Sequence, residues 1–403
     1  MRLPNIPPLK FHNAVVASAL ALVLGCVTAE AQLALSANDG KQQLLGTIPR
    51  SHTPDNVVVL DLTTLPLKVI GTVEVPTSMI GPPDAVAIAH NGTFALVSNA
   101  QKFDPSDPTK FVLDNTVSVI DLKDPRHPTV IQTVQAGAGA TGISLNRSDT
   151  LALVAATSGT ISVFSVAGKK LTLVSTVQLD PNARPVDVAI SPDGNIALVA
   201  QRSAPVLVRL AINGVNVAKT GIEIPTGYQT YGVVFSLDGK FAYNTNLGGR
   251  LAPNGQPGPA PALEHAPKIG TVTVVDLRSN RVVNTVDVGQ TPEHLVLSHD
   301  GKYLALTVGN GSSAHPGTPN YHPYGLLKLY SVDGPSLTEV AETKTGGWDQ
   351  GAVWNRDHSL ILVQTAMDKK IVVYRFDGSS LTPQPVALTF DARPGSISTA
   401  LSR

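Results

Sequence analysis

One short pattern recurs along this sequence at intervals of roughly 40 residues. Each copy has an apolar run, a turn of the type Ser-x-Asp-Gly, and a second apolar run. The clearest copies occupy residues 186–199 (VDVAISPDGNIALV) and 294–306 (HLVLSHDGKYLAL), and further copies start at Asp84, Thr141, Tyr231 and Gln350. Apolar runs joined by Asp-Gly turns are typical of antiparallel strands, and a β-rich repeat of this length is typical of one four-stranded propeller blade.

The two ends of the sequence complete the last copy. Six whole copies fit between Asp84 and about residue 388. Residues 395–401 resemble the first strand of a copy, but no second strand follows them. Residues 38–45 start with the turn Asn38-Asp39-Gly40 and continue as a strand over about 41–48, with no strand before it. We therefore predict an all-β fold, a seven-bladed β-propeller of residues 32–403 in one domain. N-terminal strands and a C-terminal inner strand close its ring, which removes two unpaired sheet edges.

Residues 1–31 are expected to be an export signal. A positively charged start precedes an apolar run over residues 14–25, which is too short to span a bilayer, and residues 29–31 (AEA) fit a small-x-small cleavage site. The alternative is a lipid anchor at Cys26, which is the only cysteine of the chain. Both alternatives predict a periplasmic or secreted protein without a transmembrane segment. Since no cysteine follows Cys26, disulfides and thiolate catalysis are excluded from the folded part.

Charge and aromatic content argue against nucleic acid as a partner. The formal net charge is zero, 15% of the residues are charged and 5% are aromatic. A nucleic-acid-binding surface requires clustered positive charge, and single-stranded binding also requires aromatic stacking platforms. The expected partners are therefore a small-molecule ligand or a periplasmic protein.

The recurring pattern resembles the YVTN-type β-propeller repeat. Residues 95–99 (ALVSN) and 241–246 (FAYNTN) stand where the Tyr-Val-Thr-Asn-like strand of that repeat falls. Relatives include lactonase-like proteins, such as 6-phosphogluconolactonases and carboxymuconate-lactonising enzymes, and exported propellers of unknown activity. The resemblance implies a seven-bladed propeller and, as one candidate activity, lactone hydrolysis. Lactonases of this family usually carry a Pro-Arg-His-like start to an inner strand, and the nearest matches in this sequence are residues 292–294 (PEH) and Arg184-Pro185.

In a propeller, the starts of the innermost strands meet on one rim, which we call the top rim. Three long insertions are expected on the same rim, at about residues 100–114, 247–269 and 309–325, and loops of this length in compact repeats are often functional. The candidate catalytic residues are Glu293 and His294. The candidate ligand-binding residues are Asp84, Arg184, Asp187, Tyr231, His315, His322, Asp349 and Arg393.

The carboxylates among these residues allow three interpretations. They could bind a divalent cation at the mouth of the pore, or they could form an acid–base pair with displaced pKa values. The third interpretation is that they hydrogen-bond backbone groups and water, as polar channel linings must. The spacing of the histidines matches no established metal-binding motif, so the sequence does not identify a metal ion. His90, His127, His299 and His358 fall in turns on the opposite rim, the bottom rim, and are expected to be ordinary surface residues.

The sequence is compatible with two classes of function. It does not decide whether the protein is an enzyme. The first is an exported binding or scaffold module that captures a ligand or a protein through its top-face loops. The second is a lactonase-like hydrolase, or a related isomerase or lyase, with Glu293 and His294 as the acid–base pair. Arg184 or Arg393 would then hold an anionic group of the substrate. A subunit of a periplasmic redox complex is a third option, based on analogy of fold alone.

Overall fold

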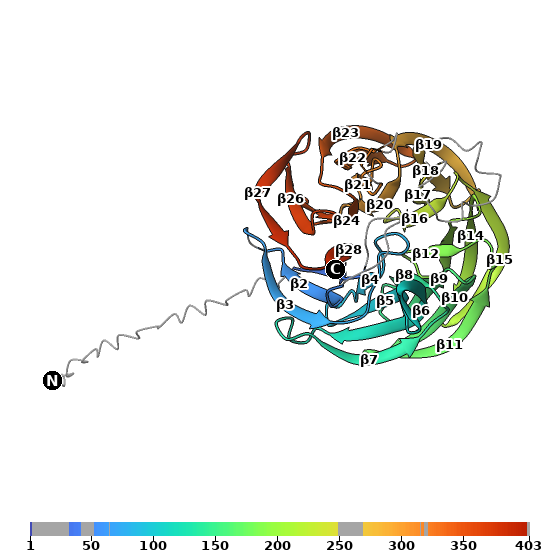
Figure 1. Cartoon of the computed structure of the whole chain (residues 1–403). Coiled ribbons are helices and arrows are strands. Elements are labelled where there is room, and N and C mark those ends of the chain that lie inside the picture. Colours follow the sequence, from blue (N-terminus) through green and yellow to red (C-terminus); the bar gives the residue numbers. More distant parts are fainter. Residues whose placement is uncertain are drawn as a thin grey trace. The chain divides into compact units, whose positions relative to one another are not determined.

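The computed structural model describes residues 1, 32–41, 52–63, 65–248, 269–314, 316–317 and 321–400. Residues 2–31 of the expected export signal, with Cys26, lie outside the described residues, and so does His315. The described residues form seven four-stranded antiparallel sheets, which stand as blades around an axis (Figure 1). In this part of the chain no helix has the length and apolar character needed to cross a membrane.

The blades follow one another along the chain, and within each blade the strands run in order from the innermost to the outermost. Blade 1 contains β4 (Val86–Ile88), β5 (Phe94–Asp104), β6 (Asp107–Asp121) and β7 (Thr129–Gln135). Blade 2 contains β8 (Ala140–Leu145), β9 (Leu151–Ala156), β10 (Thr160–Ala167) and β11 (Lys170–Gln178). Blade 3 contains β12 (Pro185–Ile190), β13 (Ile196–Gln201), β14 (Val206–Asn213) and β15 (Asn216–Pro225).

The second half of the ring has the same order. Blade 4 contains β16 (Thr230–Phe235), β17 (Phe241–Asn246), β18 (Gly270–Asp276) and β19 (Arg281–Gly289). Blade 5 contains β20 (Pro292–Leu297), β21 (Tyr303–Val308), β22 (Leu326–Asp333) and β23 (Ser336–Lys344). Blade 6 contains β24 (Asp349–Trp354), β25 (Leu360–Thr365), β26 (Lys370–Phe376) and β27 (Leu381–Thr389). Blade 7 contains β28 (Arg393–Thr399), β1 (Leu33–Asp39), β2 (Asn56–Asp61) and β3 (Lys68–Glu74).

Blade 7 confirms the predicted closure of the ring. The C-terminal strand β28 pairs with β1 in antiparallel register, with Ala34 opposite Thr399 and Ala37 opposite Ser396. The position predicted for the N-terminal partner was wrong, because the paired strand is Leu33–Asp39 rather than about 41–48. The Asn38-Asp39-Gly40 sequence ends this strand. It leads on to β2 and does not join an innermost strand to a second strand, because the innermost strand of blade 7 is the C-terminal strand β28. Residues 42–51 lie outside the described residues.

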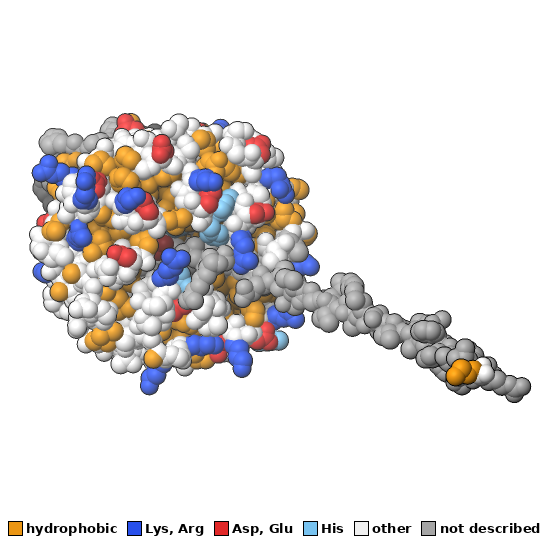
Figure 2. Space-filling view, turned by 180° about the vertical axis from the view of Figure 1, so that it is seen from behind, with side chains coloured by type: hydrophobic (Ala, Val, Ile, Leu, Met, Phe, Trp, Pro, Cys, Tyr) orange, Lys and Arg blue, Asp and Glu red, His pale blue; other side chains and the backbone are white. Residues whose placement is uncertain are grey.

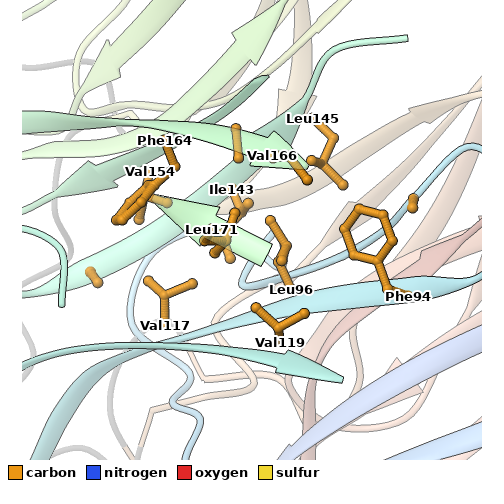
Figure 3. Close-up of a cluster of buried hydrophobic side chains, with 13 residues drawn as sticks. Phe94, Leu96, Val117, Val119, Ile143, Leu145, Val154, Phe164, Val166 and Leu171 are labelled. Carbon is orange, nitrogen blue, oxygen red and sulfur yellow. The ribbon is translucent and has the colours of Figure 1, made fainter. Parts of the chain in front are cut away.

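The core lies between adjacent blades, as the near-continuous apolar strands require. Between blades 1 and 2, Phe94 and Leu96 of β5 pack with Ile143 of β8 and Phe164 of β10, and all four are buried (Figure 3). Burying a side chain of this size contributes about 1.5–3 kcal/mol. Because neighbouring blades cover every sheet on both faces, its inner strands are buried on both sides and are mostly apolar.

The Ser-x-Asp-Gly turns have one shared structure, which explains why the sequence repeats them. In blade 3, the Ser191 hydroxyl donates to Asp193 Oδ1 (2.6 Å) and accepts a hydrogen bond from the Ile196 backbone N–H (3.1 Å). Gly194 has a φ of 74°, which an L side chain rarely adopts. The turns around Asp238 and Asp300 repeat the Ser-to-Asp bond. These carboxylates therefore shape turns.

The long insertions connect the second and third strands of their blades. The one expected at about 100–114 is a hairpin that extends β5 and β6, with Phe103 opposite Phe111 and Lys102 opposite Val112. Residues 249–268 of the second insertion lie outside the described residues. On the face seen in Figure 2, positive and negative side chains are interspersed.

Candidate functional site

The segment 75–85 joins β3 to β4 and crosses the upper end of the central channel; we call it the strap. It is the longest connection between an outermost strand and the next innermost strand, and residues 179–184 are the next longest. Gly351 of β24 and Gly395 of β28 face it so closely that a Cβ there would lie 3.1 Å from Pro83 and 2.5 Å from Met79.

The strap also reaches the blades on the other side of the channel. A Cβ at Gly81 would lie 3.1 Å from Thr141 of β8 and 3.3 Å from the carbonyl oxygen of Val186 in β12. The Gly81 carbonyl accepts a hydrogen bond from the Tyr231 hydroxyl of β16 (2.5 Å). The strap therefore fills the upper channel and touches inner strands all around it. The sequence signal that could have revealed it is the unusual length of this connection.

A buried cluster of charges fixes the start of the strap to blade 7. Lys41 Nζ contacts the carboxylates of Asp55 and Asp39, the latter at 3.2 Å, and donates to the Thr77 carbonyl (2.5 Å). Asp55 Oδ2 accepts from the Thr77 N–H (3.2 Å), and Asp39 Oδ2 accepts from the Met79 N–H (3.1 Å). Burial and the neighbouring Asp39 raise the pKa of Asp55, although Lys41 opposes this rise.

Arg393 lies at the same place, opposite Asp39 in the pairing of β28 with β1. Burial lowers the pKa of its guanidinium, and the charge of Asp39 opposes that change. Its Nη1 atom is buried and has no hydrogen-bond partner among the described residues. Arg393 therefore belongs to the charge cluster that supports the strap.

His294, a predicted catalytic residue, is held between three blades. Its Nδ1 atom accepts a hydrogen bond from the Ala352 backbone N–H (3.1 Å), so the ring proton lies on Nε2. Nε2 is 3.4 Å from Asp84 Oδ1 at the end of the strap. The His294 side chain is only 7% exposed. Both ring nitrogens thus have partners, and the imidazole holds Asp84 in place.

Both carboxylate oxygens of Asp187 also have hydrogen-bond partners. Its Oδ1 accepts from the Val188 N–H (2.8 Å), and its Oδ2 accepts from the Val233 N–H of the next blade (2.9 Å). Burial and the neighbouring Asp84 raise the pKa of Asp187 well above its ordinary range. No group of three or more His, Cys, Asp and Glu side chains within the described ranges has an arrangement that could hold a metal ion. Asp84 and Asp187 therefore serve the packing of the channel wall.

Glu293 lies in a different setting, at the junction of blades 3, 4 and 5. It occupies the second position of β20 and is 9% exposed. Burial raises the pKa of its carboxyl group from 4.5 to about 7, although the charge of Arg202 opposes this rise. A group with such a pKa exchanges protons readily near neutral pH.

Tyr231 and Arg202 form one side of this junction. The guanidinium carbon of Arg202 is 5.7 Å from the centroid of the Tyr231 ring, which is a cation–π distance. Burial and the Glu293 charge raise the pKa of Tyr231, so its hydroxyl stays protonated. The hydroxyl hydrogen is donated to the strap at Gly81. Arg202, which directly follows the apolar strand β13, was not predicted from the sequence.

Arg184 approaches the same junction from the start of β12. It is exposed, with a φ of 52°. Partial burial of its guanidinium and the neighbouring charge of Arg202 lower the pKa of Arg184. Two like charges are therefore held close together, and Arg202 of this pair lies near the Glu293 carboxyl group. Such an arrangement is stabilised when an anion binds.

Asp349 is a second buried acid near Glu293. It is fully buried, its Oδ2 accepts from the Thr345 hydroxyl (3.1 Å), and its Oδ1 has no hydrogen-bond partner among the described residues. Burial and the charge of Glu293 raise the pKa of Asp349 well above its ordinary range. A Cβ at Gly325 would lie 2.2 Å from Asp349 Oδ1, so the 309–325 insertion closes over this acid.

His322 is not part of the channel mouth. Its exposed ring lies in the 309–325 insertion, with Nδ1 3.0 Å from the Asn310 carbonyl oxygen. The structure thus divides the predicted site residues. Arg184, Tyr231 and Glu293 meet at one junction together with Arg202. Asp84, Asp187, His294 and Arg393 hold the strap and the channel wall.

Comparisons with known proteins agree with this architecture. No protein-family model matches the chain. Antigen Lp49 of Leptospira interrogans is 30% identical over 109 residues, which is 27% of this chain, and the match spans 23% of the length of that antigen. The periplasmic gluconolactonase of Pseudomonas aeruginosa has a TM-score of 0.67 and 16% identity, with 92% of this chain and 99% of that chain covered.

Two further solved structures show the same likeness. A putative 6-phosphogluconolactonase of Bacteroides fragilis has a TM-score of 0.66 and 17% identity, with 92% of this chain and 99% of that chain covered. The hydrazine synthase of Kuenenia stuttgartiensis has a TM-score of 0.55 and 16% identity, with 76% of this chain and 79% of that chain covered. At these identities the likeness concerns the fold. The chain is a seven-bladed β-propeller similar in fold to lactonase-like and 6-phosphogluconolactonase-like proteins.

Proposed function

We propose that this protein binds a small anionic ligand at the top-rim junction of blades 3, 4 and 5, and that Glu293 supplies acid–base chemistry there. The substrate class that fits is a lactone bearing a carboxylate or a phosphate. The observation that carries the proposal is the pair of neighbouring guanidinium groups of Arg184 and Arg202, of which Arg202 lies near one buried carboxyl group whose pKa is about 7.

The binding part of the proposal follows from charge. Arg184 and Arg202 repel each other, and Glu293 offsets little of this repulsion while it is protonated. A bound carboxylate or phosphate accepts hydrogen bonds from both guanidiniums and removes the repulsion. The anionic group of the ligand is therefore expected between the two arginines, with the rest of the ligand over Glu293.

The chemical part follows from the pKa of Glu293. In lactone hydrolysis, a water oxygen forms a bond to the carbonyl carbon, the bond to the ring oxygen breaks, and the product is a hydroxy acid. Glu293 in its carboxylate form takes the proton from the attacking water and then gives it to the leaving ring oxygen. A guanidinium stabilises the negative charge that develops on the carbonyl oxygen. The fold likeness to a periplasmic gluconolactonase supports this substrate class.

Ligand capture without catalysis is the second candidate function. It is favoured because the neighbouring side chains already have interaction partners. His294 has partners on both ring nitrogens, and the Tyr231 hydroxyl donates a hydrogen bond to the strap. In that case Glu293 only adjusts the affinity for the anion. We also propose that residues 1–31 direct export, so that the ligand or a protein partner is met in the periplasm or outside the cell, with a lipid anchor at Cys26 as the alternative.

The two candidate functions are separated by measuring binding and hydrolysis in the same variants. Binding of gluconate and 6-phosphogluconate is measured by calorimetry, and hydrolysis of the corresponding δ-lactones by pH-stat titration above the rate in buffer. Arg202→Gln is expected to lose anion binding, whereas Glu293→Gln is expected to bind and to lose hydrolysis. The matched controls are Arg278→Gln and Glu223→Gln, which change exposed residues of the same types.

Three results decide between the proposals. Equal binding by the wild type and Arg202→Gln contradicts the anion site. Equal hydrolysis by the wild type and Glu293→Gln contradicts the role of the carboxyl group. Binding that Arg202→Gln abolishes, without hydrolysis in any variant, leaves the ligand-capture function.

A further inference from the structure

Two histidines from neighbouring blades meet at the bottom rim. His299 lies in the turn between β20 and β21, and His358 lies in the turn between β24 and β25. Both were expected to be ordinary surface residues, but they are partly buried, and the His358 side chain is 21% exposed. Histidine side chains gather near the middle of the face shown in Figure 2. From this pair we propose a two-histidine site for a divalent transition-metal ion, with Zn²⁺ as the representative ion.

The spacing of the rings fits a shared metal ion. The ring centroids of His299 and His358 are 5.5 Å apart, with 72° between the ring planes. Two imidazoles bound to one tetrahedral zinc ion through bonds of about 2.1 Å have centroids roughly 5.3 Å apart. The observed separation of the centroids is close to this value.

The His299 ring keeps one nitrogen without a partner. Its Nδ1 atom is buried and has no hydrogen-bond partner in the described part of the chain. With the ring proton on Nε2, Nδ1 has a free lone pair, which is the tautomer that a metal ion bound at Nδ1 requires.

His358 shows the complementary pattern with a carboxylate. Its Nδ1 atom is 3.8 Å from Asp300 Oδ1, and its buried Nε2 atom has no hydrogen-bond partner among the residues that the structure describes. The Ser298 hydroxyl fixes Asp300 Oδ1 at 2.6 Å. A carboxylate that faces the far nitrogen of a histidine orients the ring and raises its basicity toward a metal. The edge of the ring also packs on Trp354, with centroids 6.2 Å apart.

Two buried nitrogen lone pairs without partners are costly to leave unused. A buried polar atom without a partner costs about 1–3 kcal/mol, and His299 Nδ1 and His358 Nε2 are both in that condition. One metal ion would satisfy both. Within the described residues no third His, Cys, Asp or Glu completes a ligand group, so water or an external donor fills the remaining positions. Imidazole favours zinc, copper and nickel over the hard ions magnesium and calcium.

The test is a metal titration of the full chain, produced without a polyhistidine tag. Calorimetry with ZnCl₂ is expected to give one bound ion per chain, and MgCl₂ is expected to give none. His299→Gln and His358→Gln are each expected to weaken zinc binding at least about tenfold, and the double variant is expected to abolish it. His127→Gln changes an exposed bottom-face histidine whose Nδ1 is 2.9 Å from Asp124, and it should bind zinc like the wild type.

A second pair of variants tests the orienting carboxylate without removing a ligand. Asp300→Asn is expected to weaken zinc binding about 10–100-fold. Asp193→Asn is its matched control, since Asp193 has the same bond from a turn serine and no histidine beside it. With Cu²⁺, electron paramagnetic resonance should show two coupled nitrogen nuclei, and one or none in the single variants.

Circular dichroism and urea unfolding establish that each variant is folded. The proposal is overturned if the wild type binds neither zinc nor copper at millimolar concentration. It is also overturned if the folded double variant binds zinc as tightly as the wild type, or if Asp300→Asn and Asp193→Asn bind zinc equally.

Discussion

Glu293→Gln should change how the stability of this protein depends on pH. In the native protein, burial raises the pKa of the Glu293 carboxyl from 4.5 to about 7. The native state therefore holds this proton more tightly than the unfolded chain does. Below about pH 4.5 the group is neutral in both states and contributes no pH-dependent cost. Between about pH 4.5 and pH 7 the unfolded chain ionises first, so the native state loses stability as the pH rises.

The size of the effect follows from the same values. At 1.36 kcal/mol per pKa unit, a rise from 4.5 to about 7 corresponds to about 3 kcal/mol, fully developed above about pH 7. Glutamine has the size of glutamic acid and carries no ionisable proton. We therefore expect Glu293→Gln to gain about 2–3 kcal/mol relative to the wild type between about pH 5 and pH 8.5.

Urea unfolding at the two pH values, followed by fluorescence and circular dichroism, measures this difference. Glu223→Gln, on the outermost strand β15, is the control, because Glu223 is exposed and should give no pH-dependent gain. If the gain of Glu293→Gln changes by less than about 0.5 kcal/mol between the two pH values, the reasoning is wrong. Glu293 would then be ionised in the native protein near neutral pH, and its proposed acid–base role would lose its basis.

Three further substitutions test the ring and the strap. Ile397→Ala removes a buried side chain from the closing strand β28 and should cost about 2–5 kcal/mol in urea unfolding, whereas Ile131→Ala on an outermost strand should cost less than about 0.5 kcal/mol. Tyr231→Phe removes the hydrogen bond to the Gly81 carbonyl; we expect a loss of about 1–2 kcal/mol in thermal unfolding and faster hydrogen exchange in the strap, and unchanged exchange would contradict the contact. Lys41→Met removes the cation that contacts Asp39 and Asp55 and should cost about 3–5 kcal/mol at neutral pH and less in acid; a pH-independent cost would contradict this reasoning.

The closing blade shows where prediction from sequence succeeds and where it stops. The C-terminal strand was found because 395–401 lacks a following strand, and its pairing with the N-terminal segment is confirmed. The choice of 41–48 over Leu33–Asp39 was wrong. Both segments lie beside the same Asp-Gly sequence, and only the pairing with β28 and β2 selects between them.

The candidate site was also predicted from the sequence only in part. Arg184, Tyr231 and Glu293 were predicted from their places at the starts of inner strands, but the sequence did not separate them from Asp187 and His294. That separation depends on hydrogen bonds between blades, such as Ala352 N–H to His294 Nδ1. Arg202 and the strap were missed, because neither belongs to the recurring pattern.

The sequence alone determined the features that form within about 40 residues of chain. The Ser-x-Asp-Gly turns, the two-sided apolar strands and the four-stranded blade depend on local contacts, so their pattern is repeated and can be read directly. The tertiary structure decided which polar groups meet across blades. Tyr231 binds the strap at Gly81, 150 positions away along the chain, and the pKa of Glu293 is set by burial that only the packed ring provides. Contacts between blades bury and orient these groups, and no local pattern in the sequence encodes them.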